Sequence, residues 1–231
     1  MNSKVCQLVI TDGREGVLER TLNSWDEKLV HKPFDYTVLV DDSASPEYQN
    51  WLRSKYAIRF NLMILHGERK GFDGAIQSGW SNIPKDADFV FHLEDDFLLN
   101  RALFLDDWIS ILKANPQVAQ IVSYRQPWSQ AEYEIGGYIP LFIRQGHTFK
   151  NEFYKDENGK EWAVVEHRRH FSTNPCLYRR RIVEVGWPSA PGYTSEDLVG
   201  PRIFEKYPGS VYLIWGHKDD EPLVHHFGRS K

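Results

Sequence analysis

The chain has few cysteines, no long apolar run and no strong excess of either charge. Two cysteines, Cys6 and Cys176, occur in 231 residues, which excludes a disulfide framework and is typical of a reducing compartment. No apolar run approaches the ~20 residues of a membrane-spanning helix. The opening MNSKVCQLVI lacks the charged start and long apolar stretch of a signal peptide. We therefore expect a cytoplasmic protein without a transmembrane segment.

The remaining composition is that of an ordinary globular protein. Hydrophobic residues make up 41% and charged residues 26% of the chain, as in most soluble domains. The formal net charge of −4 argues against non-specific binding of nucleic acid by the whole surface. We interpret two basic clusters, HRRH at 167–170 and RRR at 179–181, as solvated faces or ion-pair partners. The aromatic content of 14% suits a core and also stacking on sugar rings.

Apolar segments typical of buried strands alternate with helical patterns over the first 125 residues. Short strands are expected at residues 5–10, 36–40, 60–65, 88–93 and 118–124. Apolar residues at helical spacing predict helices between them, at about residues 18–29, 46–52, 76–83 and 100–112. Ser45-Pro46 offers a capping hydroxyl and a first-turn proline to the second helix. The alternation predicts an α/β fold with a mainly parallel sheet flanked by helices.

The pattern changes after residue 125. Residues 126–171 predict an irregular, β-containing elaboration with few helices. Within it, Asn158-Gly159 predicts a tight hairpin turn in which both residues take positive φ angles. A helix is expected around 196–207, and strands are expected at 211–216 and 222–228. No repeat or linker divides the chain, so we interpret residues 1–231 as one domain with two halves, 1–125 and 126–231.

Acidic residues follow two of the predicted strands. Asp41 and Asp42 end the second strand, and Glu94, Asp95 and Asp96 end the apolar strand in FVFHLEDDFLL (89–99). Ligands of open α/β sheets bind beyond the carboxyl ends of the strands, so these acids are expected in one crevice. Strand alternation places the first and third acids of the triplet on one side and the second on the other.

Three adjacent carboxylates repel one another, and burying unpaired charge costs several kcal/mol per ion. A divalent cation offsets that cost, and hard oxygen ligands suit Mg²⁺ or Mn²⁺. The alternative is a loop whose acids cap the next helix or face water. The position at the end of a strongly apolar strand favours the metal site.

Several segments, in their order along the chain, resemble GT-A fold glycosyltransferases close to family 2. The segment at 68–80 departs from the family pattern, because Gln77 and Ser78 stand where asparagine is commoner. The matching segments are TDGREGVLERTLNSW (11–25), VLVDDSAS (38–45), ERKGFDGAIQSGW (68–80), FHLEDDFLL (91–99), NPCLYRRRIVEVGWP (174–188), TSEDLVGPRIFEK (194–206) and LVHHFGRSK (223–231).

The resemblance implies that residues 1–125 bind a nucleotide-sugar donor and that 126–231 bind the acceptor and carry the base. FHLEDDFLL corresponds to the metal-binding Asp-x-Asp motif in a Glu-Asp-Asp form, with Asp96 as ligand of Mn²⁺ or Mg²⁺. The late histidine of the metal shell corresponds to His225 or His226, with His226 favoured. Donor-binding positions implied in this way are Thr11, Arg14, Asp41, Asp42, Lys70, Gly71, Gly74, Glu94 and Asp95.

The Glu196-Asp197 pair corresponds to the family's catalytic-base motif. Asp197 is the expected general base, Glu196 is its closest rival, and a direct displacement favours inversion over retention. The same residues also fit a plain helix start in which Ser195 is the cap. Aromatic residues expected near the acceptor, some of them in the core, are Trp128, Tyr138, Trp162, Trp187 and Tyr193.

The resemblance implies transfer of a sugar from a nucleoside-diphosphate donor, with UDP-sugars the commonest, to an acceptor hydroxyl. The acceptor stays open between a glycan, a protein and a modified nucleic-acid base. Two other functions are considered. One is a nucleotidyltransferase on a similar sheet, although TDGREG is a weak version of its glycine-rich basic loop. The other is a sugar- or nucleotide-binding module without catalysis, which the intact acidic pairs disfavour.

Overall fold

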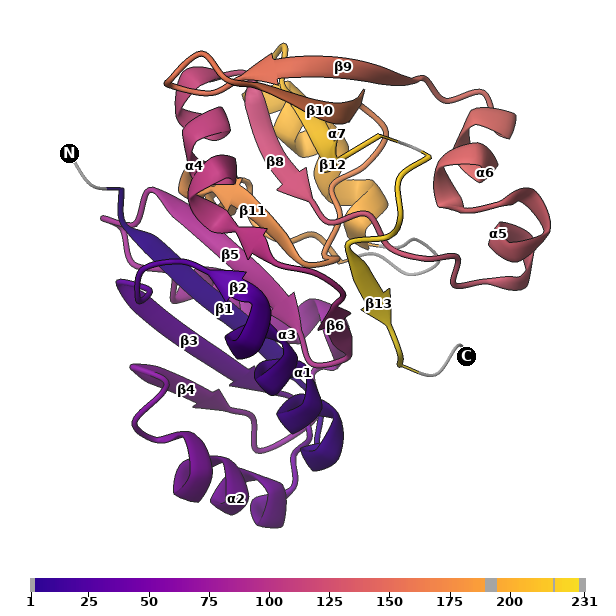
Figure 1. The fold of residues 1–231 in the computed structure, drawn as a ribbon. Coiled ribbons are helices and arrows are strands. Elements are labelled where there is room, and N and C mark those ends of the chain that lie inside the picture. Colours follow the sequence, from indigo (N-terminus) through magenta and orange to yellow (C-terminus); the bar gives the residue numbers. More distant parts are fainter. Residues whose placement is uncertain (1–2, 190–194, 218, 229–231) are drawn as a thin grey trace.

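A nine-stranded sheet runs through the molecule from β4 to β9 (Figure 1). The computed structural model describes residues 3–189, 195–217 and 219–228. All strands run in one direction except β10 and β11, which run against their neighbours. The strand order is β4 (Leu62–Leu65), β3 (Tyr36–Asp41), β1 (Val5–Thr11), β5 (Phe89–Glu94), β11 (Cys176–Arg179), β8 (Val118–Val122), β12 (Val211–Trp215), β10 (Glu161–His167) and β9 (Phe149–Lys155).

Helices cover both faces of this sheet, as the alternating pattern predicts. Val5 and Val9 of β1 pack in the core beneath one set of helices, whereas Leu8 and Ile10 pack beneath the other. The strand is buried along its whole length, because alternate side chains enter opposite cores. The first set is α1 (Glu15–Lys28), α2 (Pro46–Tyr56) and α4 (Leu105–Ala114). The second is α3 (Gly71–Ser81), the 3₁₀ helix η1 (Arg180–Val185) and α7 (Ser195–Lys206).

One helix start and one helix end differ from their predicted positions. The helix expected from about residue 100 begins at Leu105, because the preceding residues form β6 (Phe97–Leu99) and β7 (Leu103–Phe104). β6 pairs with β13 (Val224–His226), and β7 pairs with β2 (Leu29–Val30). The chain at residue 29, expected in the first helix, is therefore already a strand. Both corrections come from pairing with distant segments, which a local apolar pattern does not contain.

The second half holds two short helices that the prediction of an irregular elaboration missed. They are α5 (Gln130–Ile135) and α6 (Tyr138–Arg144), beside the sheet at its β9 end (Figure 1). Ser129 caps the start of α5: its hydroxyl accepts from the backbone N–H of Glu132, while the Glu132 carboxylate accepts the backbone N–H of Trp128 rather than that of Ser129. That Ser-x-x-Glu spacing was present in the sequence. Its signal was weak because the helix has only six residues.

The predicted hairpin forms β9 and β10, but its turn has a different conformation. Gly159 alone has a positive φ, of 79°, and Asn158 does not. The Asp156 carboxylate accepts the backbone N–H groups of Asn158 and Lys160 at 2.8 and 3.0 Å. This side chain supports a longer turn, so a two-residue turn with two positive φ angles is not needed.

The RRR cluster stabilises the fold. Arg179 donates from Nε to the carbonyl of Val118 at 2.8 Å and from Nη2 to the carbonyls of Leu112 and Asn115 at the end of α4. Burial lowers the pKa of Arg179 to about 10.

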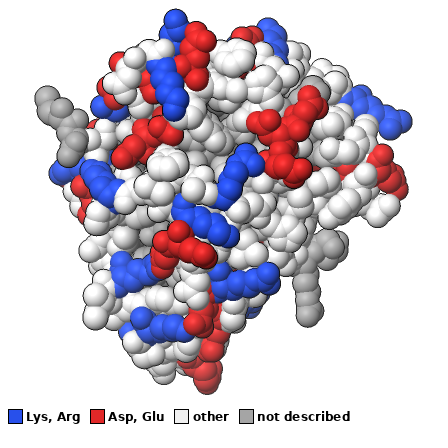
Figure 2. Space-filling model, viewed as in Figure 1, with Lys and Arg blue, Asp and Glu red and all other residues white. Residues whose placement is uncertain are grey.

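On the face shown in Figure 2, basic and acidic side chains are interspersed. Within the described residues, no helix is long and apolar enough to cross a membrane.

The cap of α2 can be tested by mutation. The Ser45 hydroxyl accepts the backbone N–H of Tyr48 at 3.2 Å. We expect Ser45→Ala to lower the free energy of unfolding by about 1 kcal/mol, measured by urea denaturation. Ser54→Ala, which removes only a hydroxyl bonded to the Trp51 carbonyl on the exposed side of α2, is the control. Equal losses in the two variants would contradict the cap.

Candidate active site

A cavity of about 320 Å³ lies where β1, β3 and β5 end. The carboxyl ends of these parallel strands meet at one edge of the sheet, which is where open α/β folds bind ligands. Its lining includes six residues predicted from the sequence: Thr11, Arg14, Asp42, Gly71, Glu94 and Asp95. The convergence of acids from separate strand ends is therefore present in the structure.

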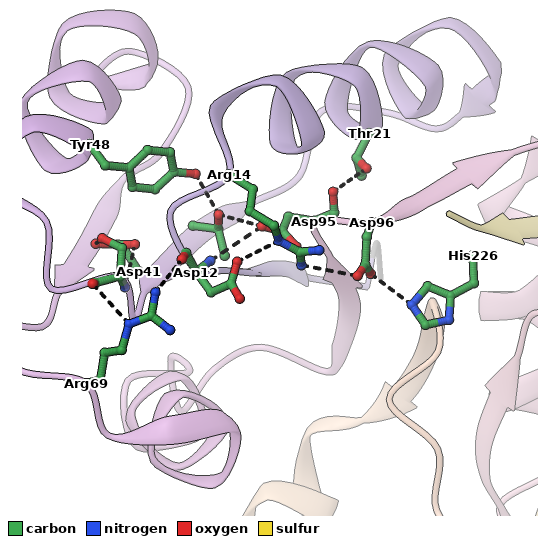
Figure 3. Close-up of polar contacts among 11 residues, drawn as sticks. Asp12, Arg14, Thr21, Asp41, Tyr48, Arg69, Asp95, Asp96 and His226 are labelled. Carbon is green, nitrogen blue, oxygen red and sulfur yellow. Dashed lines mark hydrogen bonds and ion pairs between the residues drawn. The ribbon is translucent and has the colours of Figure 1, made fainter. Parts of the chain in front are cut away.

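Asp95 is a buried carboxylate that contacts both β1 and the start of α1 (Figure 3). It is 2% exposed and accepts from the Thr11 hydroxyl at 2.8 Å and from Arg14 Nη2 at 2.5 Å. Thr11 also contacts the Tyr48 hydroxyl at 2.6 Å, which ties α2 to the same group. Burial raises the pKa of Asp95 to about 7, although Arg14 acts in the opposite direction. The site thus holds a carboxylate whose charge depends on one guanidinium.

Arg14 bridges two members of the acidic triplet. Its Nη2 contacts Asp95 at 2.5 Å and Asp96 at 3.1 Å, while Nε donates to Asp12 at 2.6 Å. Burial opposes its charge, but these three carboxylates raise the pKa of Arg14 above its ordinary value. The predicted alternation of the triplet does not hold, because β5 ends at Glu94 and the next two residues form a turn. Glu94 and Asp95 therefore both line the cavity.

Asp41 and Asp42 have different surroundings. Asp41 is fully buried and accepts from the backbone N–H and hydroxyl of Ser43 at 3.0 and 2.8 Å. Asp42 lines the cavity and accepts the backbone N–H groups of Lys70 and Gly71, both at 2.8 Å. A carboxylate at these two amides stabilises the start of α3. Of the pair, Asp42 alone reaches the cavity.

The turn before α3 contributes Arg69 as well as the predicted residues. Arg69 lines the cavity and donates to the carbonyls of Ser43 and Asp12, both at 3.3 Å. Lys70 is not part of the lining and contacts the site through its backbone. Gly71 has a φ of +72°, which a residue with a side chain rarely adopts. From the sequence ERKG alone, Arg69 and Lys70 were equally good candidates for the site. Only the folded structure shows that Arg69 lines the cavity and Lys70 does not.

Glu94 belongs to a buried polar chain that reaches α7. Burial raises its pKa to about 7, Asp96 acts in the same direction, and the Thr173 hydroxyl lowers it. Thr173 also donates its backbone N–H and hydroxyl to Glu196 at 2.6 and 3.0 Å. Burial likewise raises the pKa of Glu196. Thr173 was not predicted from the sequence, and it connects the two acidic motifs.

Asp96 and His226 are the two side chains whose arrangement most resembles part of a metal site. The imidazole Nε2 lies 3.3 Å from Asp96 Oδ1, and Figure 3 marks this contact with a dashed line. Burial raises the pKa of Asp96, but His226 and Arg14 outweigh it, and the net pKa is lowered. The ring of His226 is stacked between Phe97 and Trp128, with centroid distances of 4.3 and 3.7 Å. His225, its neighbour on β13, is exposed.

The C-terminal segment closes tightly over this pair. A Cβ atom on Gly228 would lie 2.2 Å from Asp96 Oδ2 and 3.2 Å from His226 Nε2, so only glycine fits there. Within the described ranges, no group of three or more His, Cys, Asp or Glu side chains is arranged to hold a metal ion. Asp96 Oδ1 is buried and accepts no hydrogen bond from the described residues. The protein therefore offers two neighbouring ligand atoms, and a bound cation would need further ligands from water or substrate.

Asp197 lies outside the first cavity, in the first turn of α7. Its Oδ1 contacts Arg169 Nη1 at 2.5 Å, and its side chain is 40% exposed. Arg169 was not predicted as a site residue. The helix starts at Ser195, so that residue is its first member. Asp197 connects to the first cavity through its neighbour Glu196, Thr173 and Glu94.

The predicted acceptor aromatics have different places. Trp128 stacks on His226, beside the candidate metal pair. Tyr138 and Trp187 are buried in the core, and Trp162 packs against the core with Trp215. Tyr193 lies outside the described residues.

Comparison with known proteins defines the fold class. No protein-family model and no curated protein matches the sequence. Among solved structures, S. aureus TarS 1–349 in complex with UDP-GlcNAc matches with a TM-score of 0.61 and 15% identity, covering 99% of this chain and 59% of that one. GalNAc-T7 with UDP, GalNAc and Mn²⁺ matches with a TM-score of 0.64 and 14% identity, covering 99% and 44%.

These structures are GT-A fold glycosyltransferases, and the chain has their fold. The resemblance expected from the sequence motifs is confirmed at this level. The chain spans less than two thirds of the length of these structures. At such identity the likeness defines architecture, and the activity has to be argued from the site.

The raised pKa of Glu94 predicts a pH dependence of stability. Between its ordinary value of 4.5 and about 7, the folded state holds a proton that the unfolded state has released. The free energy of unfolding therefore falls as pH rises through this window. We expect Glu94→Gln to be more stable than the wild type by about 2 kcal/mol at pH 8, with no gain near pH 4.

Urea unfolding across this pH range measures the effect. Glu68→Gln, at an exposed position beside the same cavity edge, is the control and should leave the profile unchanged. A pH-independent difference between Glu94→Gln and the wild type would contradict the raised pKa.

Proposed function

We propose that the protein is a metal-dependent glycosyltransferase that moves a sugar from a nucleoside-diphosphate donor to an acceptor hydroxyl. The observation that carries this proposal is the 320 Å³ cavity at the carboxyl ends of β1, β3 and β5. It combines Asp42, which follows β3, and Arg69, from the turn before α3, with the triplet's Glu94 and Asp95. TarS binds UDP and UDP-GlcNAc, and GalNAc-T7 binds UDP and GalNAc. A UDP-sugar is therefore the proposed donor.

Mn²⁺ or Mg²⁺ is the proposed cofactor, with Asp96 and His226 as its protein ligands. Asp96 Oδ1 is buried, and the imidazole Nε2 of His226 lies 3.3 Å from it, so these two atoms fit such an ion. These cations take their remaining ligands from waters and substrate phosphates. When bound, the ion stabilises the charge that develops on the leaving diphosphate. Phe97 and Trp128 hold the imidazole in position.

Asp197 is proposed as the general base that removes the proton of the acceptor hydroxyl. Its partly exposed carboxylate at the start of α7 suits this role, because it is reachable by an acceptor and held by Arg169. Glu196 is half-buried beside Thr173 and is proposed to position the helix start. A direct displacement assisted by this base inverts the anomeric carbon.

Two rival functions give different products. A nucleotidyltransferase releases pyrophosphate, and a binding module releases nothing. The proposed enzyme releases free nucleoside diphosphate. An assay of Mn²⁺-dependent product release over a panel of nucleotide sugars distinguishes the three.

The metal pair predicts how donor binding responds to mutation. With Mn²⁺ and a UDP-sugar at about 100 times its Kd, we expect the melting temperature to rise by about 5 to 10 °C. Asp96→Asn should lose most of this rise, because it removes one of two metal ligands. Asp86→Asn, which breaks an exposed ion pair with Lys4 before β5, is the control. A full metal-dependent rise in Asp96→Asn would refute the assignment of Asp96 as a metal ligand.

The proposed base predicts a defect confined to transfer. Asp197→Asn should lower kcat for sugar transfer ~10²–10⁴-fold and leave the donor-induced thermal shift intact. Glu205→Gln, on an exposed position of the same helix, should behave as wild type. If Asp197→Asn kept its transfer activity and Glu196→Gln lost it, Glu196 would be the general base instead of Asp197.

A further inference from the structure

A second cavity, of about 340 Å³, lies between the start of β9 and the end of β10. Figure 1 shows this hairpin at the opposite end of the sheet from β4. The cavity wall carries three permanent cations, two histidines and one carboxylate: Lys150, Arg168, Arg169, His147, His167 and Glu166. None of these residues belongs to the first cavity.

The positive charge in this cavity is only partly compensated. Arg169 is paired with Asp197, and Lys150 stands opposite Glu166 in the β9–β10 register, but within the described chain neither Lys150 nor Arg168 forms an ion pair. Arg168 places its guanidinium 4.9 Å from the centroid of the Phe204 ring, which leaves its N–H edges for an acceptor. Glu166 accepts a hydrogen bond from the Tyr154 hydroxyl. An anion is therefore the ligand that this wall favours.

His167 adds a buried donor without an acceptor. The residue is 4% exposed, and its Nδ1 accepts the backbone N–H of Arg169 at 3.3 Å. Burial lowers the pKa of His167 well below 6.5, so the ring is neutral and its proton is assigned to Nε2. In the described structure, Nε2 is buried and has no hydrogen-bond partner. Leaving such a donor unsatisfied is costly, so the position favours an acceptor oxygen.

Arg169 connects this cavity to the proposed base. It lines the cavity and its Nη1 contacts Asp197 Oδ1 at 2.5 Å. A group bound in this cavity can therefore contact Arg169, which in turn contacts Asp197. We propose that the second cavity binds an oxyanion, a phosphate or a carboxylate, which is carried by the acceptor next to the hydroxyl that receives the sugar. This inference rests on the proposed function for its acceptor role, whereas the oxyanion site itself does not.

Direct binding tests the site without activity. Inorganic phosphate and acetate are titrated into the full chain without metal or donor and followed by calorimetry. We expect saturable binding that weakens about tenfold or more in Lys150→Gln and in Arg168→Gln, because each loses a charge-assisted contact. Lys155→Gln, on the same strand but paired with Glu161, and Arg53→Gln, at an exposed position of α2, should bind as wild type.

A resonance of His167 reports whether the ion binds in this cavity and not elsewhere on the protein. In ¹⁵N-histidine-labelled protein, the Nε2–H resonance of His167 should shift on saturation with the ion. No saturable binding, or equal binding in all four variants, would overturn the site. Circular dichroism melts identify any variant that fails to fold, and Lys150→Gln and Arg168→Gln provide two independent tests.

A matched acceptor pair tests the acceptor role. A neutral glycoside and the same glycoside carrying a phosphate are compared by kcat/KM. The phosphorylated acceptor should be preferred at least tenfold in the wild type, and this preference should vanish in Arg168→Gln but persist in Lys155→Gln. Free phosphate should compete with the acceptor. If it binds but does not compete, the ligand is a free ion and the acceptor role is wrong. If no donor is turned over, the proposed function and acceptor role fail, while calorimetry still decides the site.

Discussion

The buried ion pair between Asp95 and Arg14 is the interaction on which the rest of the site depends. A carboxylate that is 2% exposed is costly unless donors satisfy it, and here a guanidinium at 2.5 Å and the Thr11 hydroxyl do so. The Thr21 hydroxyl donates to the backbone carbonyl of Asp95 at 2.6 Å. The end of β5 is thereby fixed to β1 and α1, and through Tyr48 to α2. The shape of the first cavity follows from this network.

The same network separates the three acids of the triplet. Glu94 lies in a buried chain with Thr173, Asp95 is held by Arg14, and Asp96 is held by Arg14 and His226. Burial raises the pKa values of Glu94 and Asp95 to about 7, whereas the contacts with His226 and Arg14 lower that of Asp96. Asp96 is therefore the acid most readily ionised. This difference favours it over its neighbours as the ligand of a cation.

The two halves of the chain meet through polar contacts as well as through the sheet. Thr173 joins Glu94 of the first half to Glu196 of the second, and Asp96 Oδ1 of the first half lies 3.3 Å from His226 Nε2 of the second. The proposed donor site and proposed base are thus parts of one packed unit. The second cavity, next to Asp197 across Arg169, extends the same unit toward the β9–β10 hairpin.

Local sequence patterns were enough to predict the alternating strands and helices of residues 1–125 and the sheet edge at which acids gather. Strand and helix patterns are local, so residues 5–10 and the cap at Ser45 were predictable without any distant contact. The tertiary structure decided which of the gathered residues reach the cavity. Thr11 meets Asp95 across 84 positions of sequence, and packing selected Arg69 over Lys70 and Asp42 over Asp41. In each case the outcome depends on the direction in which a side chain points from its turn. Contacts with residues far away in the sequence fix that direction.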